Sequence, residues 1–515
     1  MKNKTPSYAA SLCLMLGALS SSVYAADSSW TGGGSDDLWS TAGNWSGTPD
    51  GTFGSSDVLT LGLSSDTTPV VDDNSPWYLE RLVFAGSGAT SLSGNTLSMT
   101  VPSVGYMISV TGTGSYTVDN DIDVAVGGGG SFLQMSSGNA SQLRLNGDIT
   151  LGSGDKLLLR GSASNATLYG KISGLGNTEV ELGKTETGSW RFYNGNNQIS
   201  KITHERGNIR LGVDQGFGDG VELDFRPASG HSASVSLQGF TQRFGGITTA
   251  NASETAGDIE FFSYNPGGEV IYDRDSGSGD QTFSGRFGTS SSAGQFSITK
   301  EGTNTFTLTG DSEYTGSTSI HEGTLALSGD ASISESSNIA VASGAFFDVS
   351  GLTSGFTLEA DQALSGSGTI INTGKTLQVQ GTLSPESGTL IVDGGILALG
   401  GDASMAFELG TVSDEISLIN SSELNLGSES FGFSDLAITM GSGFGAGTYT
   451  LISSGVSISG ELDSSDLSGS IGAYTGTLEV NGTSLELTVI PESSSYSAIM
   501  GFVVFSSFVL FRRRR

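Results

Sequence analysis

The chain has 515 residues, of which 78 are glycine and 9 are proline, and only 15% are charged. The formal net charge is −31, and because so acidic a surface repels phosphate backbones, nucleic-acid binding is excluded as a function class. The scarcity of proline excludes a collagen or a proline-rich stalk, and the single cysteine, Cys13, excludes a disulfide framework.

Residues 1–25 have the layout of a secretory signal peptide. Two lysines form a positive start, an apolar segment covers residues 9–19, and small residues precede a cleavage site between Ala25 and Ala26. The sequence therefore predicts an exported protein. Because Cys13 lies in the leader, the mature chain has no thiolate to offer a metal ion.

We predict that residues 26–413 form a β-solenoid repeat region that opens with a tryptophan-rich segment. Trp30, Trp39 and Trp45 fall within its first 20 residues, and Trp77 follows. Buried tryptophans at this point would close the open core of the first coil, which is the arrangement that we expect. Exposed, coplanar tryptophans would instead stack on sugar rings, and a carbohydrate-binding surface protein is therefore kept as an alternative.

Short runs along the chain alternate between apolar and polar residues, for example 143–145, 306–308 and 485–489. A period of two is typical of strands with one buried face. Between the two ends of the chain, the sequence shows no sustained apolar stripe with the 3.6-residue period of a helix. The pattern therefore predicts an all-β body.

Two stretches align without a gap, one from Lys184 to Leu211 and the other from Lys300 to Leu327. Each has an aromatic residue six positions after the lysine and a glycine further on, followed by a strand-like run. The Gly-Thr-Leu unit of the second stretch recurs later in the chain. Such recurrence indicates a stack of similar coils that bury their apolar side chains against one another.

The second stretch resembles a known repeat. Residues 300–310 read KEGTNTFTLTG, and Tyr-Thr-Gly at 314–316 and Gly-Thr-Leu at 323–325 follow. This is similar to the autotransporter-associated β-strand repeat of passenger-type surface proteins. The resemblance implies that the body is a right-handed parallel β-helix.

Residues that carry chemistry are sparse. The chain has three histidines with no metal-ligand spacing among them, and we expect His204 and His321 at surface turns. Asp119, Asp121 and Asp123 share one strand face but have no visible companion ligands, so they are interpreted as turn and strand-edge residues. We predict no catalytic residue, no cofactor and no metal site. A polysaccharide-active β-helix enzyme, which would need two carboxylates converging on one groove, is the alternative.

Residues 414–489 are predicted as a membrane-proximal β segment, with more irregular strand spacing that allows a small β-sandwich. The apolar run at 496–511 would form a helix of roughly 24 Å, short of the ~30 Å hydrocarbon core of a bilayer. Terminal arginines would hold its end in the cytoplasm by the positive-inside rule, which leaves the body outside. These arginines are Arg512, Arg513, Arg514 and Arg515.

Residues 490–515 resemble the PEP-CTERM sorting signal of Gram-negative envelope proteins. Pro491 and Glu492 precede a serine-rich stretch, a short apolar helix and the arginine cluster, and Ser493 stands where the family has a second proline. The resemblance implies recognition and cleavage by an exosortase-type enzyme after export by the secretion machinery.

These features together predict a non-catalytic, structural or adhesive protein of the cell envelope or cell surface. A C-terminal transmembrane helix would anchor it in the membrane at least transiently. An extracellular polysaccharide is a candidate partner, and nucleic acid is not.

Overall fold

The computed structural model describes most of the body of the chain. Three predicted features lie outside the described residues: the signal peptide with its cleavage site at Ala25 and Ala26, the apolar C-terminal helix, and Arg512 to Arg515. The described residues are 27–46, 58–62, 67–71, 77–79, 81–99, 107–124, 132–136, 142–161, 166–183, 188–249, 259–288, 295–386, 388–428 and 431–492.

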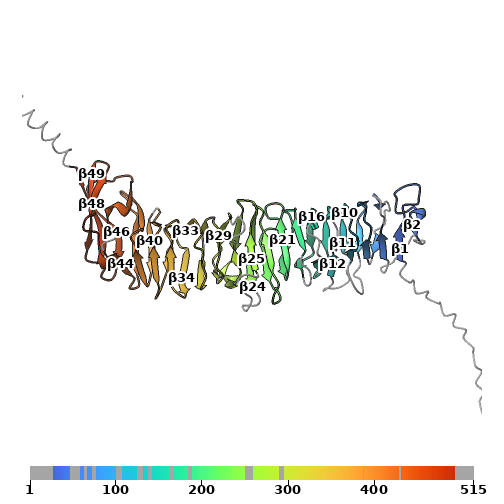
Figure 1. Ribbon diagram of the computed structural model, residues 1–515, viewed down its shortest axis with the longest axis horizontal. Helices are drawn as coiled ribbons and strands as arrows, with labels where there is room; N and C mark the ends of the chain where they lie inside the picture. The colour runs from blue at the N-terminus through green and yellow to red at the C-terminus, as the bar shows by residue number, and fades with distance from the viewer. Residues whose placement is uncertain are drawn as a thin grey trace, which may run out of the picture.

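The body is a long rod of strands stacked along one axis, with the N-terminal coils at one end and the C-terminal coils at the other (Figure 1). A 19-stranded sheet, here the spine sheet, runs through it, and all of its pairings are parallel except that of β1 with β2. Its strands are β1 (Asp27–Trp30), β2 (Trp45–Ser46), β3 (Val58–Leu61), β6 (Arg81–Phe84), β9 (Ile108–Val110), β12 (Phe132–Ser136), β15 (Lys156–Arg160), β18 (Glu179–Leu182), β20 (Lys201–His204), β22 (Val221–Phe225), β24 (Thr241–Thr249), β26 (Glu269–Asp273), β29 (Ser297–Glu301), β31 (Thr318–Ile320), β33 (Asn338–Val341), β36 (Ala363–Gly366), β39 (Thr382–Ser384), β42 (Ser404–Leu409) and β45 (Leu436–Met440).

The N-terminal half has two further parallel sheets, which form the other sides of the coils. The N-terminal lateral sheet contains β4 (Val70–Val71), β7 (Thr90–Gly94), β10 (Ser115–Val118), β13 (Gln142–Leu145), β16 (Ala166–Leu168), β19 (Ser189–Phe192), β21 (Gly207–Leu211), β23 (Ala233–Ser236), β25 (Ile259–Phe262) and β28 (Arg286–Phe287). The third side contains β5 (Trp77–Leu79), β8 (Leu97–Met99), β11 (Ile122–Val124), β14 (Ile149–Leu151) and β17 (Ile172–Gly174).

The C-terminal half replaces these two sheets with another pair, while the spine sheet continues. The C-terminal lateral sheet contains β27 (Gln281–Phe283), β30 (Thr305–Leu308), β32 (Thr324–Gly329), β34 (Phe346–Leu352), β37 (Thr369–Ile371), β40 (Thr389–Asp393), β43 (Glu415–Ile419), β46 (Gly447–Ser454), β48 (Ser468–Ile471), β49 (Tyr474–Asn481) and β50 (Ser484–Pro491). The third side contains β35 (Phe356–Leu358), β38 (Thr376–Val379), β41 (Ile396–Leu399), β44 (Glu423–Ser428) and β47 (Ser459–Glu461). Short 3₁₀ helices are η1 (Ala42–Asn44), η3 (Ser276–Ser278) and η4 (Phe433–Asp435).

Each coil adds one strand to the spine sheet, but the coils differ in length. Ala363 lies beside Thr382 on the next coil, whereas Met405 lies beside Leu436. At about 4.8 Å between neighbouring strands, the spine sheet is about 80 Å long. The all-β, parallel solenoid predicted from the sequence is confirmed. The right-handed winding that the repeat resemblance implies stays a prediction.

The core lies inside the rod and is built mainly from alternate residues of the strands. In β30, for example, Phe306 and Leu308 are buried and the threonines beside them are partly exposed. Aromatic rings cluster in the core around residues 217–287. There Phe261 packs against Phe225, Phe244, Phe283 and Phe287, with ring centroids 5.0–5.7 Å apart.

The segment 414–489 contains both parallel and antiparallel pairing. β43 and β44 continue the parallel stacks, and β46 pairs in parallel with β43 but antiparallel with β50. β50, β49 and β48 then form an antiparallel meander that extends the C-terminal lateral sheet. In the described part of the chain, no helix has the length and apolarity needed to cross a bilayer.

Glycine is required at the turn that precedes β32. Gly323 has φ +64, and a Cβ there would lie 2.5 Å from the carbonyl oxygen of Asn304 and 2.6 Å from that of Gly302. We expect Gly323→Ala to lower the free energy of unfolding by about 2–3 kcal/mol, because left-handed strain and a backbone clash add together. Urea unfolding followed by circular dichroism measures this loss.

Gly329 is the matched control, since it has φ +68 at the other end of the same strand and a Cβ there would meet nothing within 4 Å. Gly329→Ala should carry only the cost of the left-handed conformation, about 1 kcal/mol. Equal losses for the two variants would mean that the close approach at Gly323 does not matter.

Candidate functional site

The two aligned stretches of sequence have the same local strand pairing. In the first, Trp190 of β19 lies beside Ile209 of β21. In the second, Phe306 of β30 lies beside Leu325 of β32 in the same relation. Lys184, which opens the first stretch, lies outside the described residues, so the fate of the lysine can be followed only in the second.

Lys300 is buried inside the solenoid, at an inward position of β29 beside Tyr272 and Ile320. Its Nζ donates hydrogen bonds to three carbonyl oxygens, those of Glu301 at 2.8 Å, Gly302 at 2.7 Å and Glu322 at 3.2 Å. Burial lowers the pKa of Lys300 to about 8, although nearby carboxylates oppose this shift. Lys300 therefore stabilises the turn between two coils from inside the solenoid, through hydrogen bonds to backbone carbonyl groups of both coils.

The Lys300 ammonium lies 5.6 Å from the ring centroid of Tyr272, and this ring also stacks on Phe306 at 3.9 Å. The Tyr272 hydroxyl donates to Oε1 of Gln281 at 3.1 Å and accepts from Nδ2 of Asn304 at 2.8 Å. Burial raises the pKa of Tyr272 to about 12, so the hydroxyl keeps its proton. The side chains of Lys300, Tyr272, Gln281 and Asn304 form one polar cluster within the apolar core.

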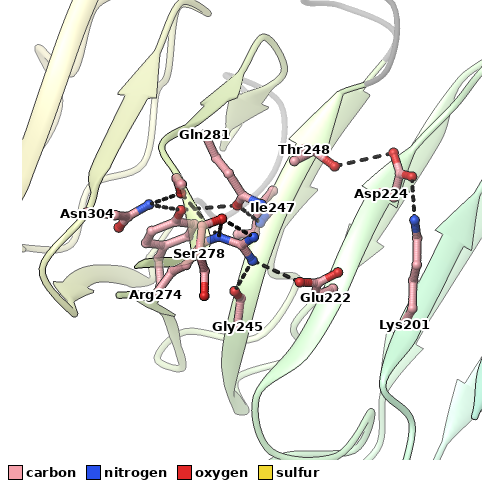
Figure 2. Close-up of polar contacts among 12 residues, drawn as sticks. Lys201, Glu222, Asp224, Gly245, Ile247, Thr248, Arg274, Ser278, Gln281 and Asn304 are labelled. Atoms are coloured by element: carbon pink, nitrogen blue, oxygen red, sulfur yellow. Dashed lines mark hydrogen bonds and ion pairs between the residues drawn. The ribbon is translucent and has the colours of Figure 1, made fainter. Parts of the chain in front are cut away.

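A second polar network lies next to Gln281 and Asn304 of this cluster and joins residues of β22 and β24 to Arg274, which follows β26 (Figure 2). Arg274 donates from Nη1 to Oε1 of Glu222 at 2.8 Å and to the carbonyl oxygen of Gly245 at 2.9 Å. Its Nη2 donates to the carbonyl oxygen of Ser278 at 2.7 Å. Next to it, Lys201 pairs with Asp224 at 3.0 Å, so that cations tie neighbouring coils together.

The carboxylates of this network are each held by a cation. Asp224 is also bonded to Arg226, 2.6 Å away. Burial raises the pKa of Asp224, but the hydrogen bonds and charges of Arg226 and Lys201 outweigh that effect and hold the pKa below its usual range. A carboxylate that stays ionised is a poor proton donor near neutral pH, and this arrangement is suited to bracing coils. The absence of catalysis stays a prediction.

The tryptophans at the start of the body are buried. Trp30, Trp39 and Trp45 are 2%, 1% and 5% exposed, and Trp45 contacts the other two edge to face at 5.0 and 5.5 Å. Trp45 Nε1 also donates to the carbonyl oxygen of Trp39 at 2.9 Å. The expected core-closing role is confirmed for these three, and a sugar-stacking role for them is wrong. The side chain of Trp77 lies outside the described residues.

This arrangement predicts weak quenching of tryptophan fluorescence. In a Trp77→Phe variant, the four remaining tryptophans, which include Trp190 at 3% exposed, are buried. We expect the acrylamide quenching constant of this variant to be severalfold smaller folded than in concentrated urea, because the rings are shielded from the quencher. Equal constants in the two states would show that the N-terminal cap is open.

The histidines divide between core and surface. His321 is exposed, as expected, and lies 3.7 Å from Glu301. The expectation for His204 is wrong, because this residue occupies an inward position of β20 and is fully buried, with Nε2 3.1 Å from the carbonyl oxygen of Ser234. Burial lowers its pKa to about 4, so the ring is neutral in the core. The alternation of Ile202 and His204 along β20 was the signal that could have found it.

The aspartates near residue 120 act as structural acceptors. Oδ1 of Asp121 accepts the backbone N–H of Asp148 at 2.8 Å, and Oδ1 of Asp119 accepts from Nδ2 of Asn146 at 2.6 Å. Asp123 is exposed on β11. Across the residues described, no group of three histidine or acidic side chains has the geometry of a metal site.

The first residues of the proposed sorting signal close the antiparallel meander. Pro491 ends β50 beside Tyr474, and the backbone N–H of Glu492 donates to the carbonyl oxygen of Ala473 at 3.1 Å. The Ser470 hydroxyl donates to Glu492 at 3.3 Å. These contacts make the first two residues of the proposed signal part of the last strand and turn that the structure describes.

Comparison with known families identifies one segment. Residues 298–327 match the model of the passenger-associated-transport-repeat. The match covers β29 to β32, and it includes buried Lys300 and the constrained Gly323. A search of curated proteins finds no match to the chain.

Proposed function

We propose that this chain is an exported, passenger-type surface rod with a structural or adhesive role and no catalytic role. The observation that carries the proposal is the passenger-type repeat at 298–327, which forms part of the solenoid wall and core. A rod of stacked coils offers a long, repetitive surface and holds its distal end far from its point of attachment. The acidic surface fits a protein that stays soluble outside the cell.

The proposal includes the sorting route read from the sequence. The secretion machinery removes residues 1–25, the apolar run at 496–511 within the signal 490–515 enters the membrane, and an exosortase-type enzyme acts on Pro491 and Glu492. The position of these two residues supports the route, because they lie at the end of the last described strand, at the edge of the meander.

Cysteine labelling on intact cells tests the surface location, since Cys13 in the predicted leader is the only native cysteine. Val412 is 78% exposed, so Val412→Cys should react on intact cells with a maleimide linked to a polymer too large to enter the periplasm. The chain without an introduced cysteine measures the background of non-specific labelling. Leu383 is fully buried, and Leu383→Cys should react only after unfolding. Labelling of Val412→Cys only after cell lysis would overturn the proposed location.

A further inference from the structure

The outer face of the N-terminal lateral sheet carries a column of arginines. The strand register places Arg144, Thr167, Arg191 and Arg210 side by side on β13, β16, β19 and β21. The residues on either side of each arginine point into the core. Arg144 is exposed, Arg191 and Arg210 are partly exposed, and Thr167 between them is only 6% exposed.

These arginines have no carboxylate partner among the described ion pairs, whereas Arg160, Lys201, Arg226, Arg243 and Arg274, in or directly after spine strands, each pair with a carboxylate. Arg210 Nε donates to the amide oxygen of Asn208 at 2.7 Å, and Arg191 Nη1 donates to the Tyr193 hydroxyl at 3.4 Å. Burial and then the charge of Arg191 lower the pKa of Arg210. The like charges of Arg191 and Arg210 on adjacent coils repel each other. Because these arginines pair with no carboxylate, their positive charge is uncompensated, although the chain has a net charge of −31.

Aromatic rings flank the arginines where β16 and β19 end. Tyr169 and Tyr193 stack with centroids 4.7 Å apart and planes 22° apart, and Tyr169 is 39% exposed. Gly212 on the next coil makes room for this pair, because a Cβ there would lie 2.6 Å from the Tyr193 ring. Tyr264, further along the same side, is 56% exposed. An aromatic ring beside guanidinium groups is suited to a ligand that carries flat ring faces, which pack on the aromatic ring, and negative charges, which pair with the arginines.

We propose that this stripe, made of Arg144, Arg191, Arg210, Tyr169 and Tyr193, binds an acidic polysaccharide whose sugars carry carboxylates. The inference rests on the proposed surface function and names the partner class. Guanidinium forks bind the carboxylates in pairs of hydrogen bonds, and the exposed ring of Tyr169, which stacks on Tyr193, lies against a sugar face. Arginines one and two coils apart, about 5–10 Å, match a polymer that presents charge repeatedly along its length. A nucleic acid fits less well, because the acidic remainder of the rod repels its denser phosphates.

Binding of the mature protein to polygalacturonate, measured by calorimetry at low and moderate salt, tests the proposal. Methyl-esterified polygalacturonate, which keeps the sugar rings but loses the charge, is the ligand control. We expect Arg191→Gln with Arg210→Gln to weaken binding by at least about tenfold, because each lost charge-assisted hydrogen bond is worth roughly a factor of ten. The fold should persist, since both side chains lie on the outside. Tyr169→Ala should weaken binding by about fivefold, because Tyr169 is the exposed ring of the stacked pair.

Arg226→Gln is the matched protein control, because Arg226 directly follows β22 of the spine sheet and pairs with Asp224. It should leave the affinity for polygalacturonate unchanged. No binding by the wild type, equal weakening by Arg226→Gln, or equally tight binding of single-stranded DNA would each overturn the proposal. A protein that labels on intact cells but does not bind polygalacturonate disproves this inference alone, whereas one that binds but is not at the surface disproves the proposed function alone.

Discussion

Replacing Lys300 with methionine is expected to remove a rise in stability that the wild-type chain shows between about pH 7 and pH 9.5. The pKa of Lys300 is about 8 in the folded state, below the ordinary value of 10.5, so the unfolded chain binds more protons over this window. Stability must then increase with pH. The expected gain is about 2 kcal/mol in the wild type, measured by urea unfolding at a series of pH values.

The upper limit of this window is set by two buried tyrosines, Tyr272 and Tyr314. The pKa of each tyrosine is raised to about 12 by burial, so above about pH 10 the unfolded tyrosines lose their protons first and stability falls again. Lys375→Met serves as the control, because Lys375 is partly exposed and contacts one carbonyl oxygen, that of Thr353 at 3.3 Å. If Lys300→Met keeps the rise, or Lys375→Met loses it, Lys300 is not the titrating group.

Truncating Phe261 to alanine should cause a loss of about 3–5 kcal/mol in the free energy of unfolding. Phe261 is fully buried, and its ring contacts four other phenylalanine rings, which come from its own coil and the two adjacent coils. Because these rings are packed against one another, none of them is free to fill the cavity. Since a solenoid is stabilised mainly by contacts between adjacent coils, the loss should appear first around residues 259–288. Urea unfolding gives the total loss, and hydrogen exchange with mass spectrometry locates it.

Phe346→Ala provides the comparison. Phe346 is 37% exposed on β34, next to buried Phe347, so its removal opens no cavity and should cost less than about 1 kcal/mol. A small loss at Phe261, or similar losses at both positions, would mean that the aromatic core is loosely packed and that the coils are held mainly by their hydrogen-bonded ladders.

The sequence was sufficient for the fold class because solenoid strands obey local rules. The alternation of apolar and polar residues around Phe306 and Leu308 predicts that one face of the strand is buried. The equal spacing of the two aligned stretches corresponds to the same strand pairing in both. The buried cap of Trp30, Trp39 and Trp45 also followed, since an open coil end must be covered by apolar side chains.

The polar residues of the core were harder to predict, because their burial depends on partners that are distant in sequence. Lys300 and His204 both lie at inward positions of regular strands, but a lysine or histidine there is acceptable only when backbone carbonyls from the next turn or coil are within reach. Alternation with Ile298 and Ile202 gave the signal, and residue type argued against it.

The arginine stripe could not be predicted from the sequence for a different reason. Arg144, Arg191 and Arg210 are neighbours only because coils of unequal length bring them into one column. The chain supplies turn lengths but not the register between coils, and a shift by one residue would turn each arginine toward the core. The structure is needed to align them.

Export and sorting are tested together by the intact mass of the protein recovered from the surface of the native cells. We expect a chain that starts at Ala26 and ends near Glu492, having lost both the leader and the arginine tail after export. A full-length mass that retains Met1, found inside the cells, would contradict export. A mass that retains Arg515 in a membrane fraction would contradict the sorting route and leave a surface rod that is simply anchored by its tail.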